Sequence, residues 1–302
     1  MTVWQNIFHG ICFSKNDWFY EYFTETAKFG IKIKEHLVDT KSEFQKIDFY
    51  DSYEYGRFFT LDGFIMLTER DEFIYHEMLV HPPMAVNPDI KDVLIIGGGD
   101  GGAVRELLRY PGIRHIDMVE IDKMVVDLCR EYLPQTACRL NDPRVSLHFC
   151  DGIAFVRNAQ ESYDLILVDS TDPVGVGEGL FSQAFYEDCA RLLAPGGIMI
   201  NQHESPYYEG DAREMERAHK KLSSVFSVCR VYQFHMPTYA SGHWLFGFAS
   251  KDREPLCFDA QAWNALGLHT DYYNTELHRG CFALPNYVLR RLAEAKSEQD
   301  GS

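Results

Sequence analysis

Acidic side chains follow several predicted strands, and their spacing is the strongest chemical signal in this sequence. Asp100 interrupts a glycine loop, while Asp169 and Asp172 lie three positions apart in a turn that Pro173 stiffens. Carboxylates that share one site repel each other, so such a cluster is costly unless a cation fills it. A divalent metal or an alkylammonium would serve. The ammonium is favoured, because no histidine or further acid lies at clear metal-ligand spacing.

The loop that contains Asp100 indicates a nucleoside site. An apolar run leads into residues 97–102, which read Gly-Gly-Gly-Asp-Gly-Gly, and a helical pattern follows at once. Glycines such as Gly97 and Gly99 let the backbone approach a ligand, and the start of the helix presents free N–H groups. Glu120 ends the next apolar run, about 20 positions further on, where an acid commonly accepts hydrogen bonds from ribose hydroxyls.

Asp151 and Gly152 follow another apolar run and leave two interpretations open. The Asp151 carboxylate is placed either to accept a hydrogen bond from an adenine amino group or to cap the helix predicted from Ile153 onward. On local sequence alone the helix cap is favoured, because aspartate is a preferred N-cap residue.

Short apolar strands alternate with helical segments from about residue 71, which predicts an α/β domain with a parallel sheet covered on both faces. We expect strands at 92–96, 115–121, 145–149, 163–169 and 197–202, and helices at 71–86, 101–110, 122–133, 151–159, 182–194 and 210–225. The first helix is expected to end at its prolines, Pro82, Pro83 and Pro88. Segments 228–234 and 243–250 should close the sheet as an antiparallel pair. Ligands bind at the carboxyl ends of strands in such sheets, so the acids should gather there.

The segment before this domain predicts a small antiparallel module. Residues 31–37 and 44–51 alternate apolar and polar side chains, and Asp62-Gly63 separates two apolar runs, which is a strong hairpin signal. We therefore expect a β-strand module at residues 1–72, of which about the first 15 are an extension, and a catalytic domain at residues 73–302.

Composition narrows the classes of partner and compartment. The chain has 302 residues and a net charge of −16, which suits small cationic molecules and argues against nucleic acid, whose phosphates need a basic face. No apolar run approaches the roughly 20 residues of a membrane span, and no secretory signal is indicated. The eight cysteines form no C-x-x-C pair, so we interpret them as reduced, mostly buried thiols of a cytoplasmic protein.

The ordered set of motifs resembles the polyamine aminopropyltransferases, the spermidine synthase family, from about Trp18 to Ser250. The matching motifs are the loop 97–102, Val119-Glu120-Ile121-Asp122, Asp151-Gly152, Asp169-Ser170-Thr171-Asp172-Pro173, Leu61-Asp62-Gly63, segment 68–73, Tyr75-His76-Glu77-Met78, Gly179-Leu180-Phe181 and Pro237-Thr238-Tyr239. The resemblance implies a Rossmann-like, S-adenosylmethionine-type sheet that is mostly parallel, preceded by a small N-terminal antiparallel β domain.

The resemblance also implies a reaction. The aminopropyl group of decarboxylated S-adenosylmethionine, a co-substrate, would pass to an amine, with 5′-methylthioadenosine as by-product and no cofactor or metal. Putrescine is the expected acceptor and would give spermidine, while agmatine, cadaverine or a longer polyamine would need only changes at the far end of the pocket. Members of the family are usually dimers or tetramers, so a homodimer or a homotetramer is expected.

Site residues follow by matching the motifs of the family. The donor side comprises Gln45, Gly97, Gly99, Asp100, Glu120, Asp151, Gly152 and Val176, and the amine side comprises Tyr75, His76, Asp100, Asp169, Asp172 and Tyr239. By this resemblance Glu120 would hold the ribose, Asp151 with Gly152 the adenine, and Asp100 the aminopropyl ammonium. Asp169 takes the place of the family's proton acceptor. Val176 and Ala240 replace prolines of the family pattern, which should alter the stiffness of both loops.

Three other functions fit part of the pattern. The glycine loop satisfies G-x-G-x-x-G and so fits a NAD-dependent dehydrogenase, but Asp100, Asp169 and Asp172 have no role in hydride transfer. An S-adenosylmethionine methyltransferase shares the sheet and the acid at a strand end. The third is a protein that only binds a nucleoside or an amine, and the retained Asp169 argues against it.

Overall fold

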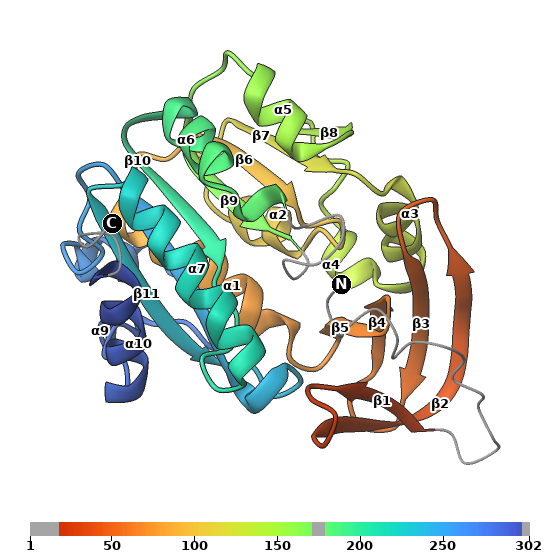
Figure 1. Cartoon of the computed structure of the whole chain (residues 1–302). Coiled ribbons are helices and arrows are strands. Elements are labelled where there is room, and N and C mark those ends of the chain that lie inside the picture. Colours follow the sequence, from red (N-terminus) through yellow and green to blue (C-terminus); the bar gives the residue numbers. More distant parts are fainter. Residues whose placement is uncertain (1–17, 171–178, 298–302) are drawn as a thin grey trace.

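Two β-sheets, joined by helix α1 (Glu72–Val86), organise the chain in a computed structural model that describes residues 18–170 and 179–297 (Figure 1). The first sheet is an antiparallel meander of β1 (Trp18–Tyr22), β2 (Lys28–Lys41), β3 (Lys46–Ser52), β4 (Arg57–Leu61) and β5 (Phe64–Thr68). The expected hairpin is confirmed. Asp62 and Gly63 both have positive φ, 50° and 89°, as a tight turn between paired strands requires.

Strand β2 is longer than the alternation in the sequence predicts, and β1 was not expected. Two register shifts interrupt the pairing of β2 with β3, between Ile33 and Glu35 and between His36 and Val38. Each irregularity changes which side chains face the core, so the period of two is lost while the strand continues.

The second sheet has the strand order β11-β12-β10-β9-β6-β7-β8. Its members are β6 (Asp92–Gly97), β7 (His115–Glu120), β8 (Val145–Phe149), β9 (Tyr163–Asp169), β10 (Leu193–Gln202), β11 (Val228–His235) and β12 (His243–Ser250). The five neighbouring strands β10, β9, β6, β7 and β8 pair in parallel. At the β10 side of the sheet, β12 pairs antiparallel with β10, and β11 pairs antiparallel with β12. This confirms the predicted mostly parallel α/β sheet, its closing pair and the N-terminal antiparallel sheet.

Helices cover both faces of the second sheet because successive residues of its strands point to opposite sides. Val93 and Ile95 of β6 pack with helix α1, with α2 (Gly102–Leu107), α3 (Lys123–Tyr132) and α4 (Pro134–Ala137). Leu94 and Ile96 face the opposite layer of α5 (Gly152–Asn158), α6 (Gln183–Leu192) and α7 (Glu209–Val225). Phe49 of the first sheet belongs to the same apolar cluster as α1, so the two sheets share one core.

Helix α1 confirms the expected extent of residues 71–86 to within one residue, but Pro82 and Pro83 lie inside it and do not end it as expected. A proline at position 82 cannot donate to the carbonyl of Met78, four residues earlier. The hydroxyl of Tyr232 on β11 donates to that carbonyl instead, at 2.9 Å. Tertiary packing therefore satisfies the group that local sequence leaves open, and the helix ends at Asn87.

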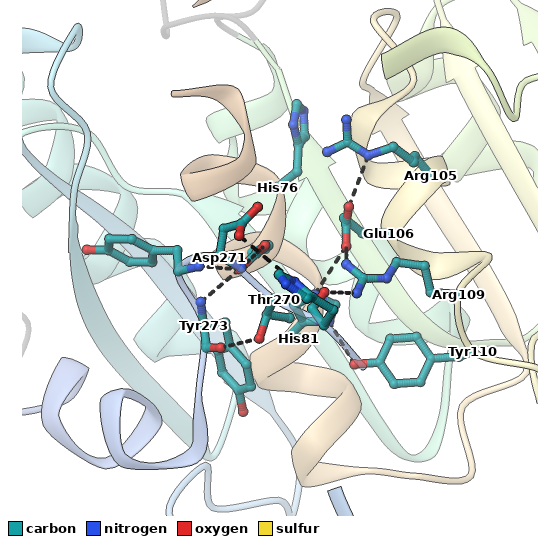
Figure 2. Close-up of polar contacts among 12 residues, drawn as sticks. His76, His81, Arg105, Glu106, Arg109, Tyr110, Thr270, Asp271 and Tyr273 are labelled. Carbon is teal, nitrogen blue, oxygen red and sulfur yellow. Dashed lines mark hydrogen bonds and ion pairs between the residues drawn. The ribbon is translucent and has the colours of Figure 1, made fainter. Parts of the chain in front are cut away.

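The C-terminal region adds the short helices η3 (Ala240–Gly242), α8 (Ala260–Ala265), α9 (Thr275–Cys281) and α10 (Asn286–Ser297), of which none was expected. Glu77 of α1 fixes this region, because its carboxylate accepts hydrogen bonds from the backbone N–H groups of Asp271, Tyr272 and Tyr273 at 2.8–2.9 Å. Figure 2 shows Asp271 and Tyr273 beside His81 of the same helix.

Cysteine burial agrees in part with expectation. Among the described residues the free thiols of Cys129, Cys189, Cys229 and Cys281 are buried, whereas Cys138, Cys150 and Cys257 are exposed. Of the helices in the described part of the chain, none has both the length and the apolar character needed to span a bilayer.

Candidate active site

A cavity of about 760 Å³ lies where the strand order of the second sheet reverses. From β6 the chain proceeds to β7 on one side, and β9 pairs with β6 on the other, so the loops after these strands diverge there. The cavity brings together the predicted residues Gln45, Tyr75, His76, Gly97, Gly99, Asp100, Glu120, Asp151, Gly152, Asp169 and Tyr239. Asp172 and Val176, which were also predicted, lie outside the described residues.

The glycine loop is fixed to the end of β9. Gly97 pairs with Asp169, and the backbone N–H of Gly98 donates to the carbonyl oxygen of Asp169 at 2.9 Å. Gly97 has φ of 88°, and a Cβ at this position would lie 2.0 Å from that same oxygen. Glycine is therefore required here because two strand ends meet, a reason that differs from the approach of a ligand inferred from sequence.

Asp169 is the central acid of the cavity. Its Oδ1 lies 2.7 Å from the hydroxyl of Tyr75, while its Oδ2 is buried and has no hydrogen-bond partner among the described residues. Burial and the negative charge of Asp100 raise the pKa of Asp169 to about 6, although the charge of His76 and the Tyr75 hydrogen bond oppose the rise. A buried carboxylate with one open oxygen and a raised pKa is suited to accept a proton near neutral pH.

Asp100 lies beside His76, which the family resemblance also placed with these acids. Nε2 of His76 is 3.1 Å from Asp100 Oδ1, which also accepts the backbone N–H of Gly102 at 2.8 Å. Ligand atoms of His76, Asp100 and Asp169 all lie within 4.8 Å of one another, so the assumption that no histidine has ligand spacing was wrong. However, Nδ1 of His76 is also 2.6 Å from a Glu72 carboxylate. A ring that donates from both nitrogens has no lone pair for a metal.

Glu120 and Gln45 also line the cavity. Burial and the charges of Asp122, Asp169 and Asp100 raise the pKa of Glu120 to about 7, against the effect of the Asp122 backbone N–H that it accepts. The amide of Gln45 donates to Asp122 at 3.1 Å. Asp122 also caps α3, so the loop between β2 and β3 is connected to the start of α3 through this residue, a link that no local motif indicated.

Asp151 confirms the helix-cap interpretation. Its Oδ1 accepts the backbone N–H of Ile153 at 2.9 Å and begins α5. Asp151 and Gly152 also line the cavity, and a Cβ on Gly152 would lie 2.7 Å from Ile96. The cap therefore fixes this loop at the cavity and leaves the second carboxylate oxygen for another partner.

Aromatic rings form a further wall beside Asp169. The Tyr75 and Tyr239 ring centroids are 5.9 Å apart, and Tyr239 and Trp244 are 4.9 Å apart, both edge to face. The hydroxyl of Tyr239 donates to the carbonyl of Met66, so this wall joins the two sheets. Tyr75 also lies 3.1 Å from Gln202 Oε1 at the end of β10.

Helix α7 contributes charged residues that no sequence motif assigns to the site. Asp211, Glu214, Arg217 and Lys221 line the cavity from this helix, together with buried Glu204 in the preceding loop. Charged side chains on an amphipathic helix normally face solvent. Only the tertiary structure therefore shows that these four residues line a cavity.

Comparisons with known families agree with this arrangement. The spermine/spermidine synthase domain matches residues 72–259, and the spermidine synthase tetramerisation domain matches residues 17–69. A polyamine aminopropyltransferase of Clostridium perfringens is 64% identical over 275 residues, which are 91% of this chain and 97% of the relative. One from Alkaliphilus oremlandii is 60% identical over 282 residues, 93% and 99% of the two chains.

Solved structures agree in fold. A crystal structure of spermidine synthase in complex with the transition-state analogue AdoDATO superposes with a TM-score of 0.90 at 37% identity, covering 95% of this chain and 99% of that one. Spermidine synthase from Thermotoga maritima gives a TM-score of 0.87 at 36% identity, covering 95% and 98%.

Proposed function

This chain belongs to the spermidine synthase family of polyamine aminopropyltransferases, and we propose that it transfers the aminopropyl group of decarboxylated S-adenosylmethionine to putrescine, giving spermidine and 5′-methylthioadenosine. Aminopropyl transfer is the activity of the family, whereas putrescine as acceptor is our proposal. The observation that carries it is the buried Oδ2 of Asp169, which has no hydrogen-bond partner within residues 18–170 and 179–297 and lies in a cavity with further acids. This suits a cationic amine that must lose a proton.

The donor would bind along the glycine loop. We assign the ribose hydroxyls to Glu120, the adenine to Asp151 and Gly152, and the aminopropyl ammonium to Asp100. Each lies in the cavity wall at a strand end, and the backbone of Gly97 and Gly99 lines the same edge. Gln45 and Val176 complete the proposed donor side by the family resemblance.

The acceptor would lie on the aromatic side. Tyr75, Tyr239 and Asp169 bound this part of the cavity, and Asp172 is assigned to it by resemblance. An ammonium with a pKa of about 10.4 has no lone pair, and acids around it raise that pKa further. Asp169 would take the proton, after which the free amine attacks the carbon next to the sulfonium and the C–S bond breaks. His76, which lies beside Asp100, is assigned to the acceptor side by the family resemblance.

No other cofactor is proposed, because a sulfonium is already an electrophile and the task of the protein is to align the amine with it. The test incubates pure protein with the decarboxylated donor and each of putrescine, agmatine, cadaverine and spermidine, with and without a metal chelator. We expect an aminopropyl adduct, strongest with putrescine and insensitive to the chelator. Preference for another amine would replace putrescine. Methyl transfer from S-adenosylmethionine, or tight NADH binding without transfer, would contradict the proposal.

We also propose a homotetramer. The family match of residues 17–69 to a tetramerisation domain supports an oligomer, and a homodimer is the alternative. The outer strand β1 exposes Trp18, Tyr20 and Tyr22, and the turn between β3 and β4 exposes Tyr53; their exposed fractions are 38–65%. Large exposed aromatic side chains grouped on one sheet are typical of contact surfaces.

We propose a cytoplasmic location for the enzyme. The free thiols at Cys129, Cys189, Cys229 and Cys281 support this, because buried cysteines that stay reduced are typical of that compartment.

A further inference from the structure

Glu72 and Arg105 form an ion pair outside the cavity lining, and the proposed mechanism does not use it. Glu72, the first residue of α1, is 5% exposed, and Arg105 of α2 donates to both of its oxygens, at 2.7 and 2.9 Å. Neither residue belongs to the described lining of the cavity. Two parallel hydrogen bonds between a guanidinium and a carboxylate fix the orientation of both side chains. Any effect on the reaction must therefore pass through a neighbour.

That neighbour is His76, which connects the ion pair to the cavity. Its Nδ1 is 2.6 Å from Glu72, and its Nε2 is 3.1 Å from Asp100. Both ring nitrogens face carboxylate oxygens, so both carry protons and the ring is an imidazolium. The ring packs closely on Gly102, where a Cβ would lie 2.2 Å from it. The histidine is therefore held in one plane as well as in one charge state.

Resting on the proposed function, we infer that Glu72 and Arg105 are positioning residues that hold His76 as a cation, so that it orients Asp100 and keeps a positive charge beside Asp169. The ring has no N–H left for an amine, because both donate to carboxylates. Its charge opposes the acids around the acceptor. The acceptor ammonium is then less strongly held in its protonated form, and Asp169 remains ionised near neutral pH.

Burial disfavours a charged His76, but Asp100 and Glu72 raise its pKa to about 10. Burial also disfavours a charged Glu72, but His76 and Arg105 lower its pKa to about 2. The titratable groups that face this set are Tyr75 from α1, Glu106 from α2, Glu120 from β7, Cys129 from α3, Asp169 from β9, and Tyr239. Figure 2 shows the chain of charges continuing from Arg105 to Glu106 and Arg109.

The test compares Glu72→Gln with the wild type over a range of pH. The neutral amide of this variant offers no negative charge to Arg105 or His76, so only Asp100 still favours the cationic ring, the positive charge beside Asp169 is reduced and the Asp169 pKa rises. We expect the acid limb of kcat/KM for the amine to move up from about pH 6 by about one pH unit. The loss should then be about twofold at pH 7, approach about tenfold near pH 5 and be mostly recovered near pH 8.5. Glu106→Gln is the matched control. It also removes a buried partner of Arg105, but not one that contacts His76, so its limb should stay in place.

Equal losses for both variants at every pH, or an unmoved limb in Glu72→Gln, would overturn the inference. A second measurement does not depend on activity. Nitrogen-15 NMR of the imidazoles, with His76 assigned by its absence in His76→Gln, should show a doubly protonated ring up to about pH 8.5 in the wild type. A neutral His76 at about pH 8 would refute this inference alone, whereas a wild-type protein without aminopropyl transfer would refute the proposed function.

Discussion

At the scale of single residues, the acids of the site differ in the environment that sets their proton affinity. The pKa values of Asp169 and Glu120 are both raised, to about 6 and about 7, because burial and neighbouring acids, which include Asp100 in both cases, disfavour the charged forms. The pKa of Glu72 is instead lowered to about 2 by its two cationic partners. Residues of one chemical type are thus divided between proton transfer, ligand binding and structure by their neighbours.

The raised pKa of Asp169 predicts an acid limb in the rate profile. A protonated Asp169 cannot accept a proton, so kcat/KM for the amine should fall about tenfold for each pH unit below about 6. Steady-state assays between about pH 5 and 9 with saturating donor measure this. A limb near pH 4, the ordinary value for aspartate, would contradict the assignment of Asp169.

Glu120 predicts a separate effect on the donor. Glu120→Gln removes the charge proposed to accept the ribose hydroxyls, and a hydrogen bond to a charged group contributes about 1.5–3 kcal/mol. Donor affinity should fall roughly ten- to a hundredfold, with little change in the rate at saturation. Titration calorimetry with 5′-methylthioadenosine would measure it. The wild-type affinity should also weaken as the pH falls through about 7, where Glu120 gains a proton. Equal affinity in both proteins would exclude Glu120 as a ribose ligand.

At the scale of elements, the meeting of β6 and β9 places the catalytic edge, and Gly97 is the residue on which it depends. Gly97→Ala should destabilise the protein by about 2 kcal/mol or more, because its positive φ and the nearby Asp169 carbonyl both reject a Cβ. Gly112→Ala is the matched control, since a Cβ there meets nothing within 4 Å and φ is not positive. Urea unfolding at one protein concentration compares them. Equal free energies of unfolding for the two variants would contradict this prediction, because they would show that the loop accommodates a Cβ at position 97 without loss of stability.

Sequence predicts the elements that carry the site because their signals are local. Strands β6, β7 and β9 are buried apolar runs that end in glycine or acid, as Asp169 illustrates. The interior prolines of α1 could not be anticipated, because a hydroxyl from Tyr232 compensates for them. The ion pair of Glu72 and Arg105 is also a tertiary contact. Its residues lie 33 positions apart, so no local sequence pattern indicates that they meet. The C-terminal helices α8 and α9 are short and defined by the caps Asp259 and Asn274 rather than by an apolar period.

At the scale of the whole molecule, the cavity depends on contact between the two sheets. Ser42 and Gln45 of the first sheet both donate to Asp122 at the start of α3, at 2.6 and 3.1 Å. The hydroxyl of Tyr239, in the loop after β11, donates to the carbonyl of Met66 on β5 of the first sheet. An assembly formed through the first sheet would therefore support the proposed donor side of the cavity as well as the quaternary structure.

Light scattering tests the assembly. A tetramer should have four times the 34.9 kDa mass of the chain. Tyr53→Lys places a charge in the exposed aromatic group and should shift the mass toward smaller species, whereas Tyr207→Lys, at an equally exposed tyrosine of the other domain, should not. A monomer at micromolar concentration would contradict the proposed quaternary structure.

The central claim is that Asp169 accepts the proton of the attacking amine, and single-turnover transfer by Asp169→Asn measures it most directly. With the decarboxylated donor bound at saturation, we expect the rate of spermidine formation from putrescine to fall by about 10²–10⁴, while calorimetry finds donor affinity nearly unchanged. The residual rate should also lose its acid limb near pH 6. A variant that forms spermidine at the wild-type rate would contradict the account.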